Sequence, residues 1–334
     1  MILVVGATGQ LGAAAVKLLR EAGREVRVYV RTEEAARRFE AMGCESYVGD
    51  ITHPGLAKGP LPRVETIIAT ATASTPSRPG DRIENADGQG IRNLIAAAAE
   101  AGWVKQFIFP SVCDAPGALG VPLFRIKREN ERLLMESGLG YTIFRLPAFM
   151  DVAFPMMGCA ALLEGVESAT LARPCSFLQN HFARIRDSVL CDGVIHLAGD
   201  GSVPQPYIAA GDAARLIAAA VGRPATLKRV LEITGPEALS GEQVAQIFER
   251  ILGRMLRRKY TPAAVFRMLQ LGLRPFQPAA SNIMAIQHWG ATTPVPVRGQ
   301  ELAAEPGVRL TTAEEFLRAR LASAAAAAAA AASA

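Results

Sequence analysis

Apolar and polar positions alternate between two spacings along the first half of the chain. Short apolar runs, typical of buried strands, are separated by longer segments in which apolar residues recur every three or four positions, as on a helix that faces a core. The runs predict strands at residues 2–5, 26–30, 45–48, 66–69, 107–109 and 141–145. The intervening segments predict helices at residues 13–22, 33–42, 85–102 and 121–137. Strands that alternate with helices predict an α/β protein whose parallel sheet is covered by helices on both faces.

The pattern in the second half is less regular. Apolar runs predict strands at residues 193–197 and 205–208, and the Gly199-Asp200-Gly201 turn between them predicts a hairpin. Asp212 is expected to cap a helix over residues 213–221.

Two further segments are rich in apolar residues. Residues 263–273 predict a helix with apolar side chains around most of its circumference, and such a helix packs against another surface. Residues 149–179 contain Phe154, Met156 and Met157. We interpret this segment either as a lid or partner surface over a ligand or as apolar filling of a substrate lobe.

Glycines recur at every third position directly after the first predicted strand, at Gly6, Gly9 and Gly12. In such a turn the first glycine permits a tight bend, the second lets the backbone approach a pyrophosphate, and the third allows close packing of helix on strand. The phosphates then bind the free N–H groups at the helix N-terminus. The flanking strands and helix therefore favour a dinucleotide site. The alternative is a glycine-rich turn in an ordinary strand–helix–strand unit with no ligand.

The residues at the ends of the next strands bear on the choice of cofactor. A site that prefers NAD usually has an acid after the second strand, but this chain has Arg31 there. A guanidinium can bind the 2′-phosphate of NADP in bidentate fashion, so NADP(H) is favoured over NAD(H). The alternative for Arg31 is a solvated surface arginine. Asp50 is expected either to accept a hydrogen bond from the adenine amino group or to cap the turn at Thr52. Ala71 belongs to a run of small residues that lets the chain pass under a cofactor.

Length and composition exclude several classes of protein. The 334 residues, half of them hydrophobic and a fifth charged, suit one large α/β domain with a smaller lobe. No apolar run reaches the roughly 18 residues of a membrane span, and the apolar start is interpreted as a strand, so a cytoplasmic protein is expected. The five cysteines are scattered and the four histidines share no metal-ligand spacing, so we expect neither a disulfide framework nor a metal site.

Charge is distributed unevenly. Residues 250–300 contain eight basic residues and no Asp or Glu, while the net charge of the whole chain is +5. The remainder is therefore 5 − 8 = −3. We expect residues 250–290 to bind an anionic membrane face, a membrane protein complex or an acidic protein surface, with contributions from Arg254, Arg257 and Arg258. The alternative is a buried helix with solvated arginines. No DNA-reading motif is present, so specific binding of nucleic acid is not expected.

Several motifs resemble those of the NmrA-like group of atypical short-chain dehydrogenases, over about residues 1–320. They are Gly6-Ala7-Thr8-Gly9-Gln10-Leu11-Gly12, Val30-Arg31, Gly49-Asp50, Phe109-Pro110-Ser111, Lys127 with Glu131, the run from Tyr141 to Pro147, the helix start at Asp212, and residues 231–236. Within the group, residues 122–127, 274–276 and 281–283 are most similar to the photosystem II assembly-factor branch of cyanobacteria and plastids.

This resemblance implies a Rossmann-type, doubly wound parallel sheet with a smaller C-terminal α/β lobe. It implies an NAD(P)-binding core at residues 1–150 and a substrate or partner lobe at residues 151–322, interleaved with the core. Residues 323–334 form an alanine-rich tail, to which we assign no function. The predicted cofactor-binding residues are Gly6, Thr8, Gly9, Gln10, Leu11, Gly12, Arg31, Asp50, Ala71 and Lys127.

The resemblance also raises a catalytic question. Many members of the wider superfamily use Tyr-x-x-x-Lys with an upstream Ser, and the Tyr transfers a proton while the nicotinamide transfers hydride. Here Lys127 and Ser111 are present, but Leu123 stands where the Tyr would be. Either Lys127 takes over as acid or base, as resembling reductases of the isoflavone reductase type imply, or the cofactor binds without chemistry and Lys127 holds its ribose. The alternatives are a surface Lys127 paired with Glu131 at i+4 and a Ser111 that is a strand-end hydroxyl.

Two functions therefore stay open. One is an NADP(H)-binding accessory or assembly subunit of a membrane protein complex, such as a photosynthetic one, in the cytoplasm or peripheral at the cytoplasmic membrane face. The other is an NADPH-dependent reductase of a quinone, carbonyl or alkene that uses Lys127. The missing Tyr and the basic segment favour the first.

Overall fold

A seven-stranded parallel sheet forms the larger part of the protein. The computed structural model describes all residues except 54, 55, 57, 58, 77, 79, 165–177, 305, 306, 333 and 334. The strands are β1 (Ile2–Val5), β2 (Val26–Val30), β3 (Glu45–Val48), β4 (Thr66–Ala69), β5 (Gln106–Val112), β6 (Tyr141–Leu146) and β10 (Arg229–Glu232). Their order is β10-β6-β5-β4-β1-β2-β3. The six strands predicted for the first half are confirmed, and β5 runs on through Pro110 and Ser111.

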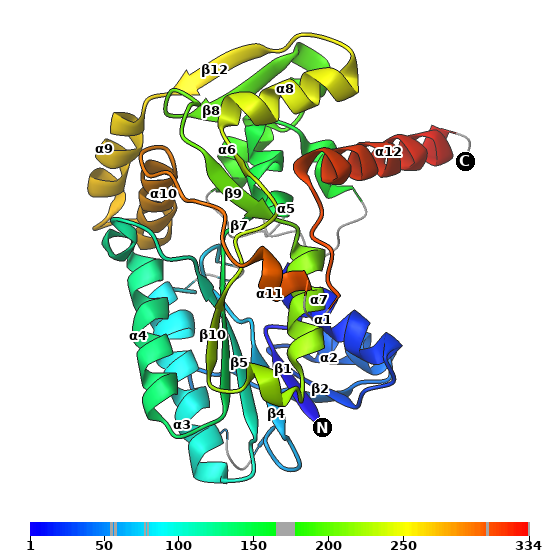
Figure 1. The fold of residues 1–334 in the computed structure, drawn as a ribbon, viewed down its shortest axis with the longest axis vertical. Coiled ribbons are helices and arrows are strands. Elements are labelled where there is room, and N and C mark those ends of the chain that lie inside the picture. Colours follow the sequence, from blue (N-terminus) through cyan, green and yellow to red (C-terminus); the bar gives the residue numbers. More distant parts are fainter. Residues whose placement is uncertain are drawn as a thin grey trace.

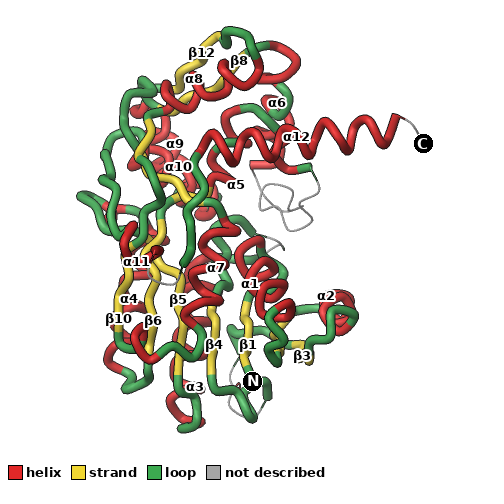
Figure 2. The backbone as a smooth tube through the Cα atoms, turned by 45° about the vertical axis from the view of Figure 1, so that its right-hand side comes forward, coloured by secondary structure: helices red, strands yellow, loops and turns green. Residues whose placement is uncertain are grey.

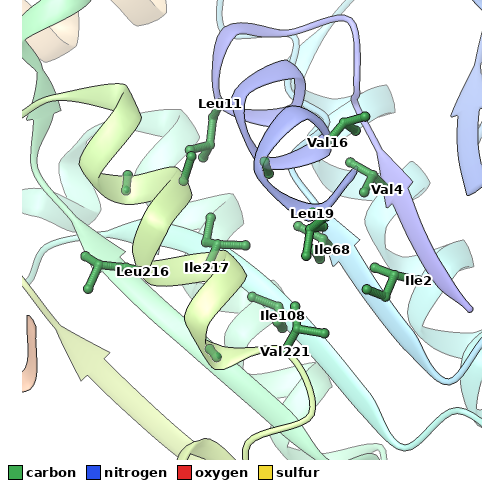
Figure 3. Close-up of a cluster of buried hydrophobic side chains, with 14 of the residues drawn as sticks. Ile2, Val4, Leu11, Val16, Leu19, Ile68, Ile108, Leu216, Ile217 and Val221 are labelled. Atoms are coloured by element: carbon green, nitrogen blue, oxygen red, sulfur yellow. The ribbon is translucent and has the colours of Figure 1, made fainter. Parts of the chain in front are cut away.

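Helices cover both faces of this sheet (Figures 1 and 2). Successive residues of a strand point to opposite faces, so Val4 packs with Leu19 and Ile217, while Leu3 packs with Leu94. The first core lies under α1 (Gln10–Glu21) and α7 (Ala210–Ala220), as Figure 3 shows, and the second under α3 (Ile91–Ala101) and α4 (Pro122–Glu136). The doubly wound α/β fold of Rossmann type is confirmed.

The helix predicted at residues 85–102 has two parts. It begins as a π-helix, Glu84–Gly90, and continues as α3. Gly90 packs against Ile51, because a Cβ at position 90 would lie 2.6 Å from the Ile51 Cγ1 atom. The π-helix carries Asp87, whose residue is only 1% exposed.

Two small sheets lie beyond the end of the large one. The first joins β7 (Ala148–Phe149), β9 (Gln205–Ile208) and β11 (Ala238–Leu239), and the second joins β8 (Val194–Ala198) and β12 (Arg257–Thr261). The predicted hairpin is wrong, because β8 and β9 belong to different sheets. Gly199 and Gly201 do adopt positive φ angles, as a tight turn requires, but a local turn does not decide which strand pairs with β8.

Asp212 does not cap α7, so that prediction is also wrong. The helix begins at Ala210 with Ala209 at its N-cap, and Asp212 is buried in the first turn. There it pairs with Arg215 and accepts hydrogen bonds from the backbone N–H and the hydroxyl of Thr311. The chain thus uses Asp212 to hold residues 309–312 against α7.

The remaining helices complete the molecule. They are α2 (Glu33–Glu40), α5 (Met150–Ala153), α6 (Leu178–Ile185), α8 (Gly241–Leu252), α9 (Ala263–Leu273), α10 (Pro278–Gly290), α11 (Gln300–Ala304) and α12 (Ala313–Ala332). Figure 1 shows α9 at the outer edge beside α10, and α12 projecting from the body. Within the described part of the chain, none of the helices is long and apolar enough to cross a membrane.

The segment predicted to be a lid or an apolar filling lies partly outside the described residues, at 165–177. In its described part Phe154 is fully buried and makes ring contacts with Tyr207 and Phe316, at centroid distances of 5.1 and 5.9 Å. These contacts fit the interpretation as apolar filling for Phe154. Phe149, by contrast, lies at the cavity described next.

Candidate functional site

A cavity of about 670 Å³ opens at the carboxyl ends of the parallel strands. Gly6 to Gly12 follow β1, Arg31 follows β2, Asp50 follows β3 and Ala71 follows β4, so the strand order brings these segments to one edge. The predicted site residues in its wall are Gly6, Thr8, Gly9, Gln10, Leu11, Gly12, Arg31, Asp50, Ala71, Ser111 and Lys127. Leu123 also lines the cavity.

The glycine turn packs too closely for side chains at two positions. Gly6 has a φ angle of 90°, and a Cβ there would lie 2.5 Å from the backbone nitrogen of Ala71. A Cβ on Gly12 would lie 2.7 Å from the Thr70 hydroxyl oxygen. Gly9 is the N-cap of α1, which has no side-chain cap and no acid in its first turn. The positive end of α1 is therefore available to an anion at the cavity.

Two buried polar atoms in the cavity wall have no hydrogen-bond partner among the described residues. They are the Gln10 Oε1 atom and the Ser111 Oγ atom. A buried hydroxyl or amide oxygen without a partner is costly, because it has lost its water without replacement. The closely packed glycines of the turn, the uncapped helix and these two atoms together fit a phosphate-bearing dinucleotide.

The two residues predicted to contact the cofactor after β2 and β3 have partners within the protein. The Arg31 guanidinium contacts the Asp81 carboxylate at 2.6 and 3.2 Å, and the Arg78 backbone N–H also donates to Asp81. Asp50 accepts hydrogen bonds from the backbone N–H and hydroxyl of Thr52, at 2.9 and 2.8 Å. Asp50 thus caps the turn at Thr52, as one of its two predicted roles requires. Arg31 is exposed, as the alternative of a surface arginine expected, and its ion pair joins the loop after β2 to Asp81.

Lys127 lies at the opposite end of the cavity. Its Nζ atom donates a hydrogen bond to the Pro110 carbonyl at 3.0 Å and lies 5.1 Å from the centroid of the Phe109 ring. Burial lowers the pKa of Lys127, and the charges of Asp87 and Glu131 oppose this shift. Leu123 stands one helical turn before Lys127 and offers no proton.

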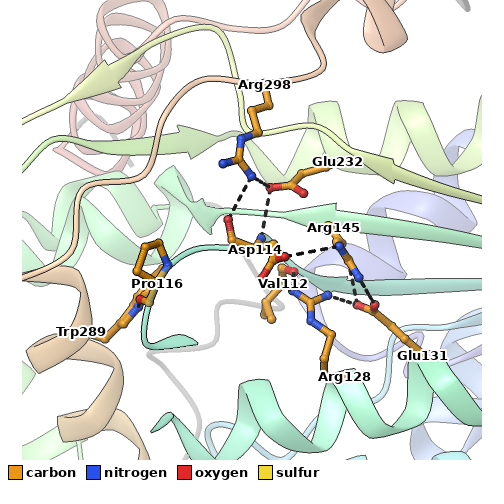
Figure 4. A network of polar contacts seen from close by, with 9 residues as sticks. All are labelled: Val112, Asp114, Pro116, Arg128, Glu131, Arg145, Glu232, Trp289 and Arg298. Carbon is orange, nitrogen blue, oxygen red and sulfur yellow. Dashed lines mark hydrogen bonds and ion pairs between the residues drawn. The ribbon is translucent and has the colours of Figure 1, made fainter. Parts of the chain in front are cut away.

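The reading of Lys127 as a surface lysine paired with Glu131 is wrong. Glu131 is fully buried, and its carboxylate binds the Arg145 guanidinium at 2.7 Å and also pairs with Arg128 (Figure 4). Arg128 further contacts Asp114 at 3.4 Å. This network joins α4 to β5 and β6 and leaves Lys127 directed to the cavity wall.

Two buried residues next to the cavity were not anticipated. The Asp87 carboxylate accepts a hydrogen bond from the Ala73 backbone N–H at 2.8 Å, and the Asn130 side chain donates to the Asp87 carbonyl at 2.5 Å. Burial raises the pKa of Asp87, while the charge of Lys127 opposes that shift. The signal was present in the sequence, because Asp87 stands four residues before Ile91 on the apolar face of the predicted helix.

The segment 278–290 reaches the same end of the cavity. Asn282 is 1% exposed, and its Oδ1 atom accepts a hydrogen bond from the Leu123 backbone N–H at 3.0 Å. Trp289 packs edge-on against Phe124 at 5.3 Å and donates to the Pro116 carbonyl at 2.9 Å. Helix α10 therefore holds the N-terminus of α4, which carries both Leu123 and Lys127.

The basic segment is partly neutralised by acids from outside it. Arg258 pairs with Glu242 at 3.2 Å and with Glu249, and Arg254 donates to the Val189 carbonyl at 2.7 Å. Arg250 and Arg298 also have acidic partners. Arg254 and Arg258 are therefore engaged within the protein. Among the described residues, no ion pair involves the cations Arg257, Lys259, Arg267 and Arg274.

Metal ligands do not converge in the described part of the chain, where no group of three His, Cys, Asp or Glu residues could hold an ion. The described cysteines are free; Cys44, Cys113 and Cys159 are buried and Cys191 is exposed. Cys175 lies outside the described residues.

With the geometry established, comparison with known proteins gives the family. The family model described as "NmrA-like family" matches residues 1–317. The chain belongs to the NmrA-like family. A relative, the photosystem II assembly factor Ycf39 of Cyanophora paradoxa, is 28% identical over 80% of this chain and 73% of its own length.

Other similar proteins carry the names of reductases. The NAD(P)H azoreductase of Xenophilus azovorans is 28% identical over 77% of this chain and 76% of its own length. The structure also resembles the NADPH-dependent quinone oxidoreductase QOR2 of Escherichia coli complexed with NADPH, with a TM-score of 0.67 and 20% identity over 94% of this chain and 98% of that one. That structural likeness shows the shared fold of this NmrA-like chain.

Proposed function

We propose that this chain binds NADP(H) in the cavity and acts as an accessory or assembly subunit of a membrane protein complex, to which it docks through residues 250–290. The observation that carries the docking role is α9, a helix without a single buried residue. The alternative of a buried basic helix is therefore wrong. The name of the Ycf39 relative supports the assembly role.

Cofactor binding is proposed for the residues at the sheet edge. The turn from Gly6 to Gly12 would hold the pyrophosphate at the N-terminus of α1, and Arg31 with Arg78 would face the 2′-phosphate. Arg31 must then leave Asp81 to bind the 2′-phosphate. The proposal of NADP rather than NAD depends on this rearrangement. Lys127 would hold the nicotinamide ribose. The bound cofactor would supply a hydride donor or acceptor.

Purification from membranes tests this role. The tagged chain is recovered from gently solubilised membranes, and the bound nucleotide is extracted and identified. A defined membrane complex that arrives with stoichiometric NADP(H) is the expected result. Replacement of Arg257, Lys259, Arg267 and Arg274 by Glu should remove the complex and leave the nucleotide.

The matched control reverses four exposed cations on other elements, Lys17, Arg24, Arg37 and Arg132, and should keep the complex. Equal loss of the complex in both variants would show a general charge effect and contradict docking through residues 250–290. Absence of any nucleotide, with none taken up on titration, would contradict the cofactor proposal.

A second candidate function is an NADPH-dependent reductase of a quinone, carbonyl or alkene. It is favoured by the position in one cavity of Lys127 and of the Ser111 hydroxyl, which has no partner among the described residues. Lys127 would hold or donate the proton that the missing Tyr cannot. Lys127→Met should abolish NADPH oxidation while the nucleotide still binds. If the protein is saturated with NADPH but reduces no substrate of the three classes, the reductase function is contradicted and the accessory role is favoured.

A further inference from the structure

The outward face of α9 is apolar, which reverses the usual pattern of a surface helix. Ala264, Met268 and Leu271 stand at positions i, i+4 and i+7 and are all exposed. Met268 is 64% exposed and Leu271 54% exposed. Phe276, just beyond the helix, is 83% exposed. These residues, Ala264, Met268, Leu271 and Phe276, are called the α9 apolar face below.

The hairpin of α9 and α10 holds this face in place. The Ser281 hydroxyl donates to the Gln270 carbonyl at 2.8 Å, and the Gln277 backbone N–H donates to the Leu273 carbonyl at 2.7 Å. Helix α10 is in turn fixed to α4 by Asn282 and Trp289. The exposed apolar side chains therefore belong to an anchored element, at the outer edge of the molecule in Figure 1.

Cations border the α9 apolar face, and the segment that carries it contains no acid of its own. Arg267 precedes Met268, Arg274 precedes Phe276, and both are exposed. Arg257 and Lys259 are exposed on β12, the strand that leads into α9. Residues 250–300 contain no Asp or Glu, so no acid within the segment opposes an anionic partner.

We infer that the α9 apolar face enters the headgroup region of an anionic lipid bilayer, with Arg257, Lys259, Arg267 and Arg274 on the lipid phosphates. This inference rests on the proposed docking role of residues 250–290 and names its partner. Basic residues beside an exposed apolar stripe are the features of a helix that lies in the membrane interface. The anionic cytoplasmic leaflet attracts such cations.

A lipid surface suits this face better than an acidic protein. Protein interfaces carry about one hydrogen bond per 100–200 Å², which requires polar groups among the apolar ones. The α9 apolar face has none, and the charged groups that border it are the cations, which lipid phosphates can bind. A bilayer requires no directional partner for apolar side chains.

Flotation of the full chain with lipid vesicles tests the inference. One set of vesicles contains phosphatidylcholine alone, and the other contains about a third phosphatidylglycerol. The chain should float with the anionic vesicles at low salt, and binding should weaken when salt is raised several-fold. The triple variant Met268→Ser, Leu271→Ser, Phe276→Ser should bind at least about tenfold more weakly.

The matched control places the same change on exposed apolar residues elsewhere, Met42→Ser, Leu119→Ser and Met135→Ser, and should bind like the wild type. A second measurement does not depend on weakened binding. A Met268→Trp side chain should be quenched by brominated lipid, while a Met135→Trp side chain should not be.

Two results would overturn the inference. One is equal flotation of the α9 triple variant and the control variant, together with no quenching at position 268. The other is no binding to anionic vesicles while the chain still captures a membrane protein complex, because the partner of the face would then be an acidic protein. The second result would leave the proposed docking role standing, so the two proposals fail separately.

Discussion

The cavity at the sheet edge and the hairpin of α9 and α10 differ in what they expose: the cavity wall holds polar atoms without partners, and the hairpin exposes large apolar side chains. In the cavity wall the Gln10 and Ser111 oxygens have no partner among the described residues. On the hairpin two buried side-chain nitrogens of α10 also lack a partner among the described residues, but the main difference is that the apolar side chains of Met268, Leu271 and Phe276 are exposed. The first pattern calls for a polar ligand with hydrogen-bonding groups, and the second for an apolar surface.

The two regions meet at one helix terminus. Asn282 of the hairpin holds the Leu123 N–H of α4, and Lys127 stands one turn further along α4. A change at the hairpin can therefore reach the nicotinamide end of the proposed site through α4. Substitutions can therefore affect one region alone or act on both through α4.

The largest effect on stability is expected for the buried ion-pair network of Glu131, which fixes α4 between the two regions. Glu131→Ala should lower the free energy of unfolding by about 3–5 kcal/mol, because Arg128 and Arg145 lose a buried carboxylate. Urea unfolding measures this change. Glu136→Ala is the control on the same helix, since its pair with Arg132 is exposed, and it should change stability little. Similar losses in both variants would contradict a special role of the buried network.

Gly6→Ala should abolish binding of nucleotide in the cavity and leave the hairpin of α9 and α10 unchanged. The positive φ angle and the contact with Ala71 predict a loss of about 2–5 kcal/mol and no measurable uptake of NADP(H) in a fluorescence titration. Gly23→Ala is the control, because Gly23 also has positive φ but meets no atom within 4 Å. It should cost only about 1 kcal/mol and bind nucleotide normally. Normal binding by the Gly6 variant would contradict the assignment of the turn.

Asn282→Ala should remove the hydrogen bond that joins α10 of the hairpin to the start of α4. The buried Leu123 N–H loses its acceptor, so unfolding should become easier by about 1–3 kcal/mol. We also expect weaker binding of NADP(H), because the start of α4 is no longer fixed. Gln277→Ala is the control at an exposed position of the hairpin. If the Asn282 variant is destabilised but binds nucleotide unchanged, α4 does not link the regions.

The smallest effect concerns the pH dependence set by Lys127. Burial lowers the pKa of Lys127 from its usual value of 10.5, so the folded protein holds this proton less tightly than the unfolded chain. The contribution of Lys127 to stability therefore increases as pH rises from the folded-state pKa towards 10.5. Urea unfolding across this range should show a steeper rise for the wild type than for Lys127→Met. Lys17→Met, at an exposed position of α1, is the control, and its stability should rise with pH as steeply as that of the wild type. An equal rise in all three proteins would contradict the prediction.

The sequence by itself determined the parts that depend on local chemistry. Apolar runs and helical spacings identify β1 to β6 and the helices between them, because each pattern reports how one segment meets a core. The same pattern of strands and helices also predicted which residues line the cavity. Parallel strands end at one edge, so residues after β1, β2, β4 and β5 had to converge there.

The tertiary structure alone decided the features that depend on distant partners. The Gly199–Gly201 turn fits a hairpin, yet β8 pairs with β12 from far along the chain. Arg258 looks like its neighbour Arg257 in sequence, but only Arg258 meets Glu242 and Glu249. Arg145 binds Glu131 and Leu123 binds Asn282 likewise from other elements. A hydrogen bond or ion pair forms where the folded backbone places two groups, and local residue patterns carry no information on that distance.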